Sequence, residues 1–368
     1  MTKMSAINIT LANDDDNDKI LGLAEKCPQE GMITYFVNRT PRFNTLHRLL
    51  DKDAWHLIAR KDDNIIGLVG VVHFPASVLG KIYKAGYMLD LRVDKAYRSG
   101  TTAFKLVRAA VDYVRESDAD MVIANFLKDN KRPLVFTKGR VGLPSAHYMG
   151  TNRIFNIIPI RSMRLDSRYK IEKPGDKDIP EIIELYRKYA SPYAIAPLIT
   201  EDRFRNYLDN ITGLSLDNFL VAKENGRIRA VTALWDEHPY KSFQVLRLNF
   251  SIRVVTGLLS LLSHFMRVPH PIRLNEPLRQ LSLVLYAHDD CPEALDTLFR
   301  HANNISMGSE YTLIMLYAPE NDPLFGSMRK FTGISVRSEM YIFAREAALI
   351  EKLKENTSGV LMDITMTI

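Results

Sequence analysis

The sequence AGYMLDLRVDKAYRSGTTAFKLVRAAVDYVRE, residues 85–116, predicts a strand, a short turn and a helix in succession. In residues 87–93 apolar and charged side chains alternate, as in a strand with one buried face. From Ala103 onward apolar side chains recur at helical spacing. The intervening turn, residues 97–102, is small and basic, and it would direct free N–H groups and the positive end of the helix dipole at one point. We therefore expect an anion site where the strand enters the helix.

This stretch resembles the GCN5-related N-acetyltransferase (GNAT) superfamily, in which an apolar strand ending in Val is followed by a Tyr-Arg pair and by Arg-x-x-Gly-x-Gly/Ala at the start of a helix. Residues 91–98, LRVDKAYR, match the approach to that signature. Arg98 and Ala103 stand at its first and last positions, while Thr101 stands at the central glycine position, one residue after Gly100.

The resemblance covers most of residues 5–160 and implies an acyl-CoA co-substrate, either acetyl-CoA or a longer acyl-CoA. Its pyrophosphate would be held by main-chain N–H groups and by the charge of Arg98. A neutral amine would attack the thioester directly, while backbone N–H groups of a splayed strand polarise the carbonyl. The residues implied in cofactor binding are Leu91, Val93, Arg98, Ser99, Gly100, Thr101, Thr102, Ala103 and Asn130.

Two residues are candidates for proton transfer. Asp90 is the first choice of base, because relatives often place a carboxylate on this strand; the alternative is a surface ion pair with Arg92 or a neighbouring Lys. The Tyr that protonates the leaving thiolate in relatives is missing, since Phe136 or Thr137 stands in its place. Tyr148 is a candidate replacement, and simple packing is the alternative.

An internal repeat extends the prediction to the whole chain. Residues 57–68 (LIARKDDNIIGL) align without gaps on residues 220–231 (LVAKENGRIRAV), and both have the pattern of a β-hairpin. A strand, an acidic loop and a helix precede each hairpin. We therefore predict an α/β protein with a mixed sheet (α+β), built from two tandem GNAT-like acyl-CoA N-acyltransferase folds at residues 1–162 and 163–368.

The second copy is expected to be degenerate. Its turn at residues 287–293, AHDDCPE, carries three carboxylates that would repel a pyrophosphate. The second copy would then bind no CoA, and would complete the acceptor pocket or stabilise the first copy. It also carries extra material at residues 251–277, in which the apolar run 254–266 favours a buried helix over an interfacial or spanning one.

The acceptor side of the first copy is expected at residues 29–50. Arg39, Arg42 and Arg48 lie there among aromatic residues, which suits an acidic acceptor. The alternative is that these are surface charges over a helix whose aromatic side chains are core.

Composition excludes several other classes of protein. The net charge of +6 mildly favours anionic partners, but no nucleic-acid-binding signature occurs and nucleic acid is not expected. The histidines are scattered and the two cysteines lie far apart, so no metal site and no disulfide framework is predicted. No signal peptide or membrane span is predicted, and the cysteine usage suits a reducing cytoplasm.

The leading functional hypothesis is therefore an acetyl-CoA-dependent N-acetyltransferase, or a related N-acyltransferase, with one active site in the first copy. One alternative is a non-catalytic module that binds CoA in a regulatory role. Another is an acyltransferase that acts on a macromolecular or lipid amine. The identity of the acceptor, the acyl length and the oligomeric state are left open.

Overall fold

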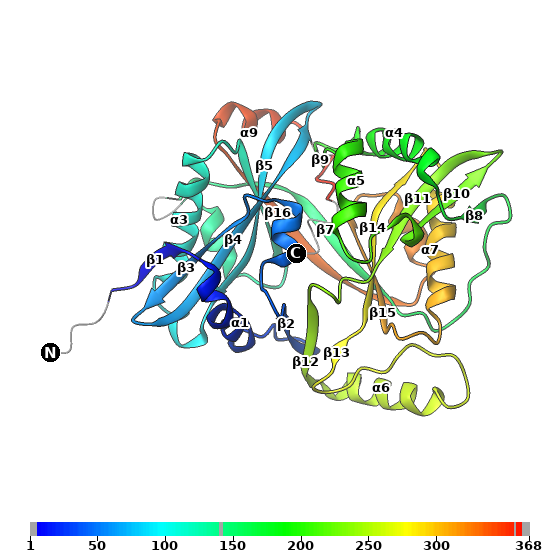
Figure 1. Cartoon of the computed structure of the whole chain (residues 1–368), viewed down its shortest axis with the longest axis horizontal. Coiled ribbons are helices and arrows are strands. Elements are labelled where there is room, and N and C mark those ends of the chain that lie inside the picture. Colours follow the sequence, from blue (N-terminus) through cyan, green and yellow to red (C-terminus); the bar gives the residue numbers. More distant parts are fainter. Residues whose placement is uncertain (1–5, 140–142, 357, 363–368) are drawn as a thin grey trace.

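A computed structural model describes residues 6–139, 143–356 and 358–362. Within them the chain forms two α/β halves that share one sheet of 13 strands, and a separate sheet of three strands bridges the halves (Figure 1). The strands of the first half are β1 (Asn8–Leu11), β2 (Ile33–Asn38), β3 (Trp55–Lys61), β4 (Asn64–Val78), β5 (Lys81–Val93), β6 (Met121–Leu127) and β7 (His147–Ile157). Its helices are α1 (Asn17–Lys26), α2 (Thr45–Leu50) and α3 (Thr102–Glu116).

The second half begins at β8 and repeats this succession with β12, α6 and β13 inserted before the counterpart of β5 and with α9 added at its end. Its strands are β8 (Lys170–Glu172), β9 (Ile195–Pro197), β10 (Phe219–Glu224), β11 (Arg227–Trp235), β12 (Ser242–Leu248), β13 (Pro277–Leu278), β14 (Gln280–His288), β15 (Leu313–Pro319) and β16 (Gly333–Ala344). Its helices are α4 (Ile179–Ala190), α5 (Glu201–Asn210), α6 (Phe250–Leu262), α7 (Pro292–Ser306), α8 (Leu324–Met328) and α9 (Ala347–Lys354).

The repeat predicted from the two hairpins is confirmed in detail. The pairing of β3 with β4 shifts register after Ala59, and the pairing of β10 with β11 shifts after Ala222, which is the aligned residue. The next residue of each strand forms an ion pair with the turn before the first helix of its half. These pairs are Arg60 with Asp16 at 2.5 Å and Lys223 with Asp178 at 2.9 Å.

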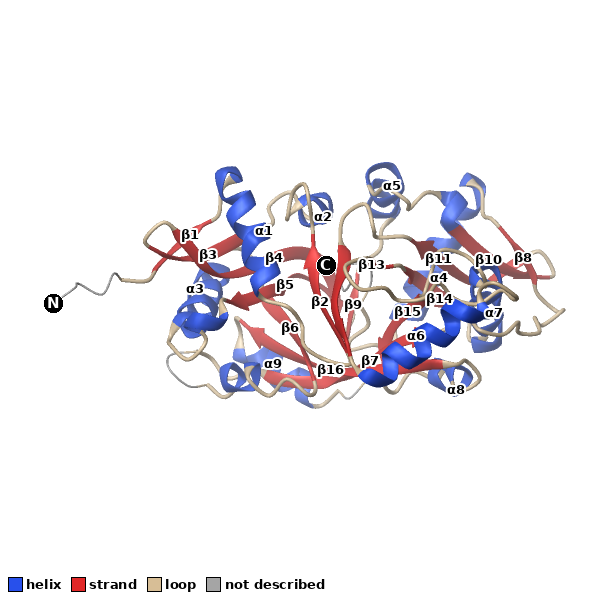
Figure 2. Ribbon diagram, turned by 90° about the horizontal axis from the view of Figure 1, so that it is seen from below, coloured by secondary structure: helices blue, strands red, loops and turns tan. Residues whose placement is uncertain are grey.

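The two halves exchange their last strands. The sheet runs in the order β6, β16, β7, β15, so that β16 of the second half pairs with β6, and β7 of the first half pairs with β15. Figure 2 shows β7 and β16 crossing between the two halves. The division at residue 162 stays a prediction about the sequence, since in space each half completes its sheet with a strand of the other.

Helices cover both faces of the first half (Figure 2). On one face α3 buries a stripe at helical spacing, as predicted: Leu106, Val107, Ala110, Val111 and Val114. On the other face α1 buries Ile20 and Leu23 against β3 and β4. The segment after β6 forms only a short 3-10 helix, Pro133–Thr137.

One expectation was wrong. The apolar run 254–266 lies outside the core, because α6 has no buried residue, and Phe265 just beyond it is 82% exposed. Figure 1 shows α6 along one edge of the molecule, where no layer of the second half covers it. An apolar run predicts contact with something apolar, but sequence alone does not say that the partner is the core of the same chain.

Candidate functional site

The site is built where two parallel strands of the first half diverge. The pairing of β5 with β6 ends at Met88 and Ala124, although β5 continues to Val93 and β6 to Leu127. Asn125 is the first β6 residue beyond the ladder, and in the described chain its buried side-chain oxygen has no hydrogen-bond partner. Backbone groups that face the opening are available to a bound molecule, because β5 and β6 no longer pair with each other there, although β4 and β16 still pair on their outer sides.

A β-bulge marks the edge of the opening. Asp90 has a φ of 56°, in the left-handed region, and the register between β4 and β5 shifts beside it. A non-glycine residue in this region is uncommon, and such residues cluster at functional sites. The second half repeats the bulge, because Leu285 of β14 has a φ of 48° at the equivalent position.

The predicted anion turn directly follows β5, at the end of the sheet where β5 and β6 diverge. It consists of a 3-10 helix, Lys95–Tyr97, and an exposed stretch that includes Arg98, Ser99 and Gly100, and it leads into α3. Thr101 is the N-cap of α3, and its side chain makes no capping hydrogen bond. The first-turn N–H groups of this 15-residue helix therefore lack a side-chain cap, as an anion site requires.

The other cofactor residues expected from the sequence lie at or near the ends of β5 and β6. Arg98 donates from Nε to the carbonyl of Val93 at 2.8 Å, which fixes its guanidinium beside the strand end. Leu91 is half-buried against the α3 side of the sheet, and Thr102 and Val93 are buried. Asn130 is exposed just beyond β6, and its backbone N–H donates to Leu127.

Asp90 lies at the centre of a buried charged cluster on the opposite face from α3. Both of its oxygens accept from Nη1 of Arg39, at 2.9 and 2.8 Å, and Oδ1 also accepts from Nη2 of Arg92 at 2.9 Å. Burial alone would raise the pKa of Asp90, but the charges of Arg39 and Arg92 hold it well below its ordinary value. The carboxylate is thus a poor proton acceptor. Its structural role is to hold Arg39 and Arg92 in position by accepting their hydrogen bonds.

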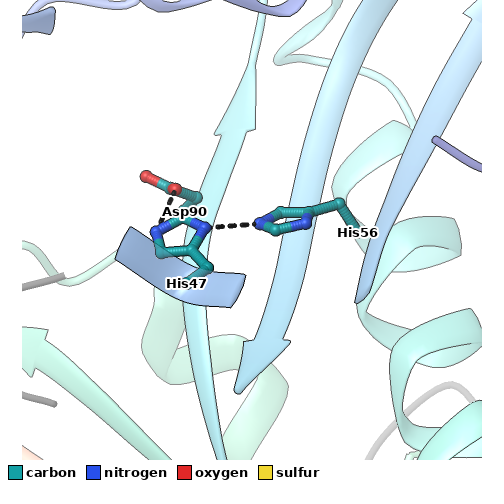
Figure 3. Close-up of side chains that lie close together, drawn as sticks. All are labelled: His47, His56 and Asp90. Atoms are coloured by element: carbon teal, nitrogen blue, oxygen red, sulfur yellow. Dashed lines mark hydrogen bonds and ion pairs between the residues drawn. The ribbon is translucent and has the colours of Figure 1, made fainter. Parts of the chain in front are cut away.

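Two histidines extend this cluster (Figure 3). Nδ1 of His47, from α2, lies 2.9 Å from Nε2 of His56, from β3. Nε2 of His47 lies 4.0 Å from Oδ2 of Asp90 and, in the described chain, has no hydrogen-bond partner. Burial lowers the pKa of His47 well below its ordinary value and lowers that of His56 to about 4, while Asp90 acts in the opposite direction on both. Both imidazoles are therefore neutral at pH 7.

The second half reaches the same cluster through a strand pairing. β12 pairs antiparallel with β2, and Ser242 at its start faces Asn38, next to Arg39. Lys241 and Glu237 form a buried ion pair there, with Nζ 3.3 Å from Oε2. Burial raises the pKa of Glu237 and lowers that of Lys241, each opposed by its partner. Residues of the second half thus close this side of the first half, where the sequence predicts the acceptor.

His47, His56 and Asp90 are close enough to hold a metal ion, with potential ligand atoms within 4.8 Å of one another. The surroundings do not suit a cation. Both oxygens of Asp90 already accept from guanidinium groups, and the two imidazoles bind each other. The positive charges of Arg39 and Arg92 at this point would also repel a divalent ion.

Tyr148 lies away from the cluster. β7 is separated from β5 by β6 and β16, so two strands lie between Tyr148 and Asp90. The side chain is 46% exposed, its hydroxyl is 2.7 Å from that of Thr151, and its ring packs against Tyr341. Asp90 and Tyr148, the two residues expected to transfer protons, therefore do not lie close together.

The second half closes the opening that the first half leaves. The pairing of β14 with β15 also ends early, at Leu283 and Leu316. Here tyrosine hydroxyls satisfy the backbone: Tyr286 donates to the carbonyl of Tyr317 at 2.7 Å, and Tyr186 donates to that of Leu285.

The anion turn of the second half is also lost. α7 begins at Pro292, only a few residues after β14 ends, and Asp289 and Asp290 form ion pairs with Lys188. A short connection of this kind leaves no loop to surround a pyrophosphate, and its carboxylates would repel one.

Sequence reasoning missed most of the buried cluster. It singled out Asp90 and, as an acceptor-side charge, Arg39, but not His47, His56, Glu237 or Lys241. His47 and His56 are separated by a loop, and their spacing matches no known motif. Glu237 and Lys241 lie in the second half. The packing of α2 on β3 brings the two histidines together, and the pairing of β2 with β12 brings Glu237 and Lys241 to them.

Comparisons with known proteins point to one family and one fold. Residues 17–134 match the model of the Acetyltransferase (GNAT) family, whereas no curated protein matches the sequence. The solved N-myristoyltransferase from Saccharomyces cerevisiae with bound myristoyl-CoA is 15% identical and has a TM-score of 0.62, covering 93% of this chain and 84% of that one.

Two further solved structures are similar over 94% of this chain and 74% of their own. A GCN5-related N-acetyltransferase from Anabaena variabilis ATCC 29413 is 10% identical with a TM-score of 0.52. A probable N-acyltransferase from Enterococcus faecalis V583 is 7% identical with a TM-score of 0.53. At these identities the likeness shows the fold alone.

Proposed function

Because this chain contains a GNAT acetyltransferase domain and folds as two tandem GNAT-like units, we propose that it transfers an acyl group from acyl-CoA to an amine. The observation that carries this function is the difference between the halves. The first half combines an open divergence of β5 and β6 with a long turn, residues 94–101, before α3. The second half has closed the equivalent divergence with tyrosines and joins β14 to α7 by a short acidic turn. We therefore place one active site in each chain, in the first half.

The turn at the start of α3 would hold the pyrophosphate of CoA. Main-chain N–H groups at the start of α3 and the charge of Arg98 supply donors and positive charge there, while the N–H of Gly100 already donates to the carbonyl of Tyr97. The pantetheine arm would lie in the opening between β5 and β6, beside Leu91 and Val93, with Asn130 at its outer end. The N-myristoyltransferase structure contains myristoyl-CoA, so the same fold accommodates long as well as short acyl groups.

In the reaction, the amine nitrogen forms a bond to the thioester carbonyl carbon, the carbon–sulfur bond breaks, and CoA leaves as a thiolate that takes up a proton from solvent, to which the base later returns the proton of the amine. The amine must also lose a proton. We assign that proton to Nε2 of His47 in place of Asp90, because both oxygens of Asp90 already accept from arginines, whereas Nε2 of His47 has no hydrogen-bond partner in the described chain. With its Nδ1–H donated to His56, His47 would present a lone pair at Nε2, and the nearby Asp90 would stabilise the imidazolium. His47 has no exposed surface, so this transfer requires α2 to shift when an acceptor binds.

A pair of isosteric substitutions tests the cofactor site. Thr101→Asp places a carboxylate at the N-terminus of α3, where it favours the helix dipole but repels a pyrophosphate, whereas Thr101→Asn has nearly the same shape and no charge. By calorimetry we expect Thr101→Asn to bind acetyl-CoA like the wild type and Thr101→Asp to bind it at least about tenfold more weakly. The thermal stability of both variants should stay at or above that of the wild type. If the two variants bound acetyl-CoA with equal affinity, the pyrophosphate site would not lie in this turn.

A non-catalytic CoA-binding module is the second candidate, because Phe136 and Thr137 stand where relatives have an acid. A thiol-release assay over a panel of amines separates the two functions. Saturable acetyl-CoA binding without release of CoA in the presence of any amine would favour the non-catalytic module. A cytoplasmic location is part of the same proposal, and the free state of Cys27 and Cys291 supports it.

A further inference from the structure

An exposed apolar stripe runs along α6 and the turn that follows it. It begins at Phe250, which is 81% exposed, and ends at Phe265, which is 82% exposed. Spacings of three and four residues place its members on the outer side of the helix: Phe250, Val254, Val255, Leu258, Leu261, Leu262, Phe265 and Met266. Soluble surfaces rarely carry so continuous an apolar stripe without a partner.

The opposite side of α6 fixes the helix to the second half. Asn249 caps the helix by accepting from the N–H of Ile252, whose side chain packs against the small core between β12 and β13. Thr256 donates to the carbonyl of Ile272 at 2.9 Å, and Arg253 donates to the carbonyl of Leu248 at 3.1 Å. Because these contacts use the inner side of α6, which lies along the edge of the molecule (Figure 1), the exposed apolar stripe is held on the outer side in a fixed orientation.

The charged side chains of the segment that carries the stripe, residues 238–275, have one sign. Between Glu237 and Glu276 the chain contains no aspartate or glutamate. Exposed arginines flank the stripe, namely Arg247, Arg253 and Arg267. An apolar helix face bordered by arginines and free of carboxylates is complementary to a surface that is apolar inside and anionic outside.

We infer that α6 docks this chain on an anionic lipid surface, with the helix lying in the interface and its apolar stripe among the acyl chains. The helix is too short to cross a bilayer, and no helix in the described part of the chain is long and apolar enough to do so. A second copy of this chain fits the stripe less well. A symmetric pair would place the same arginines against each other, with no carboxylate in the segment to neutralise them.

Vesicle co-sedimentation of the full chain tests this surface. We expect binding to vesicles of equal parts phosphatidylcholine and phosphatidylglycerol, weak binding to phosphatidylcholine alone, and a fall in binding as salt is raised. Replacing both aromatic ends, Phe250→Ser with Phe265→Ser, should weaken partitioning about a hundredfold. Replacing two arginines, Arg253→Gln with Arg267→Gln, should weaken binding to the anionic vesicles about thirtyfold at low salt.

The control is Ile82→Ser, which removes another exposed apolar side chain, 70% exposed near the turn between β4 and β5. It should leave partitioning unchanged, and thermal unfolding should show that all variants are folded. Equal binding of the wild type and the Phe250/Phe265 variant to anionic vesicles would overturn the inference. So would a concentration-dependent dimer that the same two substitutions dissociate, since α6 would then be an interface between copies. Acyl transfer to a small soluble amine should survive every one of these substitutions, which separates this inference from the proposed function.

Discussion

The substitution Asp90→Asn tests the central claim about the buried cluster, that one carboxylate holds two arginines out of water. Asn keeps the size of the side chain but removes its charge. The side chains of Asp90, Arg39 and Arg92 are 5%, 10% and 13% exposed, so solvent cannot replace the lost partner. Removing one member of a buried ion pair costs about 3–5 kcal/mol. Because Asn can still accept a hydrogen bond, we expect a loss near the lower end, about 3 kcal/mol of unfolding free energy.

Urea unfolding at pH 7 measures this loss, and Asp14→Asn is its matched control. Asp14 also lies between two arginines, Arg42 at 3.4 Å and Arg48 at 3.1 Å, but all three side chains are at least half exposed. Exposed pairs of this kind contribute at most about 1 kcal/mol. If Asp90→Asn were no more destabilising than Asp14→Asn, the buried cluster would not have the role that we give it.

The pH dependence of the same difference provides a second check. The pKa of Asp90 is lowered on folding, so its contribution is fully present above the pKa of the unfolded chain and is lost as the pH falls through the folded value. The difference between wild type and Asp90→Asn should therefore stay constant from neutral pH down to about pH 5 and shrink below about pH 4. A difference that already shrinks near neutral pH would point to another group.

Three further predictions concern the residues around the cluster. Burial lowers the pKa of His56 to about 4, so that as the pH falls the unfolded chain takes up a proton before the folded chain does. His56 should therefore account for about 2 kcal/mol of the unfolding free energy lost between pH 7 and pH 5. In urea unfolding, His56→Gln should make the unfolding free energy depend less on pH over this range. Gly70→Ala should lose about 1–3 kcal/mol, because the added Cβ would lie 2.5 Å from Cδ2 of His56, whereas Gly257→Ala on open helix α6 should lose nothing in the same thermal unfolding assay. His47→Gln should lower kcat at least about a hundredfold and remove the acidic limb of the pH–rate profile, and an unchanged limb would exclude His47 as the proton acceptor.

The fold was largely predictable because its signals are local and occur twice. The strand, turn and helix of residues 85–116 are encoded by alternation and helical spacing, and the structure has β5, the turn and α3 there. The hairpin repeat could be read from residues 57–68 and 220–231, and both hairpins even share the same register shift. The order of strands was not predictable. Nothing local in β7 or β16 indicates that each pairs with the other half.

The candidate site likewise has features that could be predicted from the sequence and features that depend on the tertiary structure. The sequence by itself determined the turn that we predict to bind an anion and the short acidic turn of the second copy, because both depend on consecutive residues whose charge and size act on the adjoining backbone. It could not determine that Asp90 is held by Arg39, that His47 meets His56, or that α6 turns its apolar side outward. These outcomes depend on contacts between residues far apart in the chain. A carboxylate on a strand has the same local sequence whether it faces water or two buried guanidinium groups, and only the packing of the two halves decides which environment, and therefore which pKa, it has.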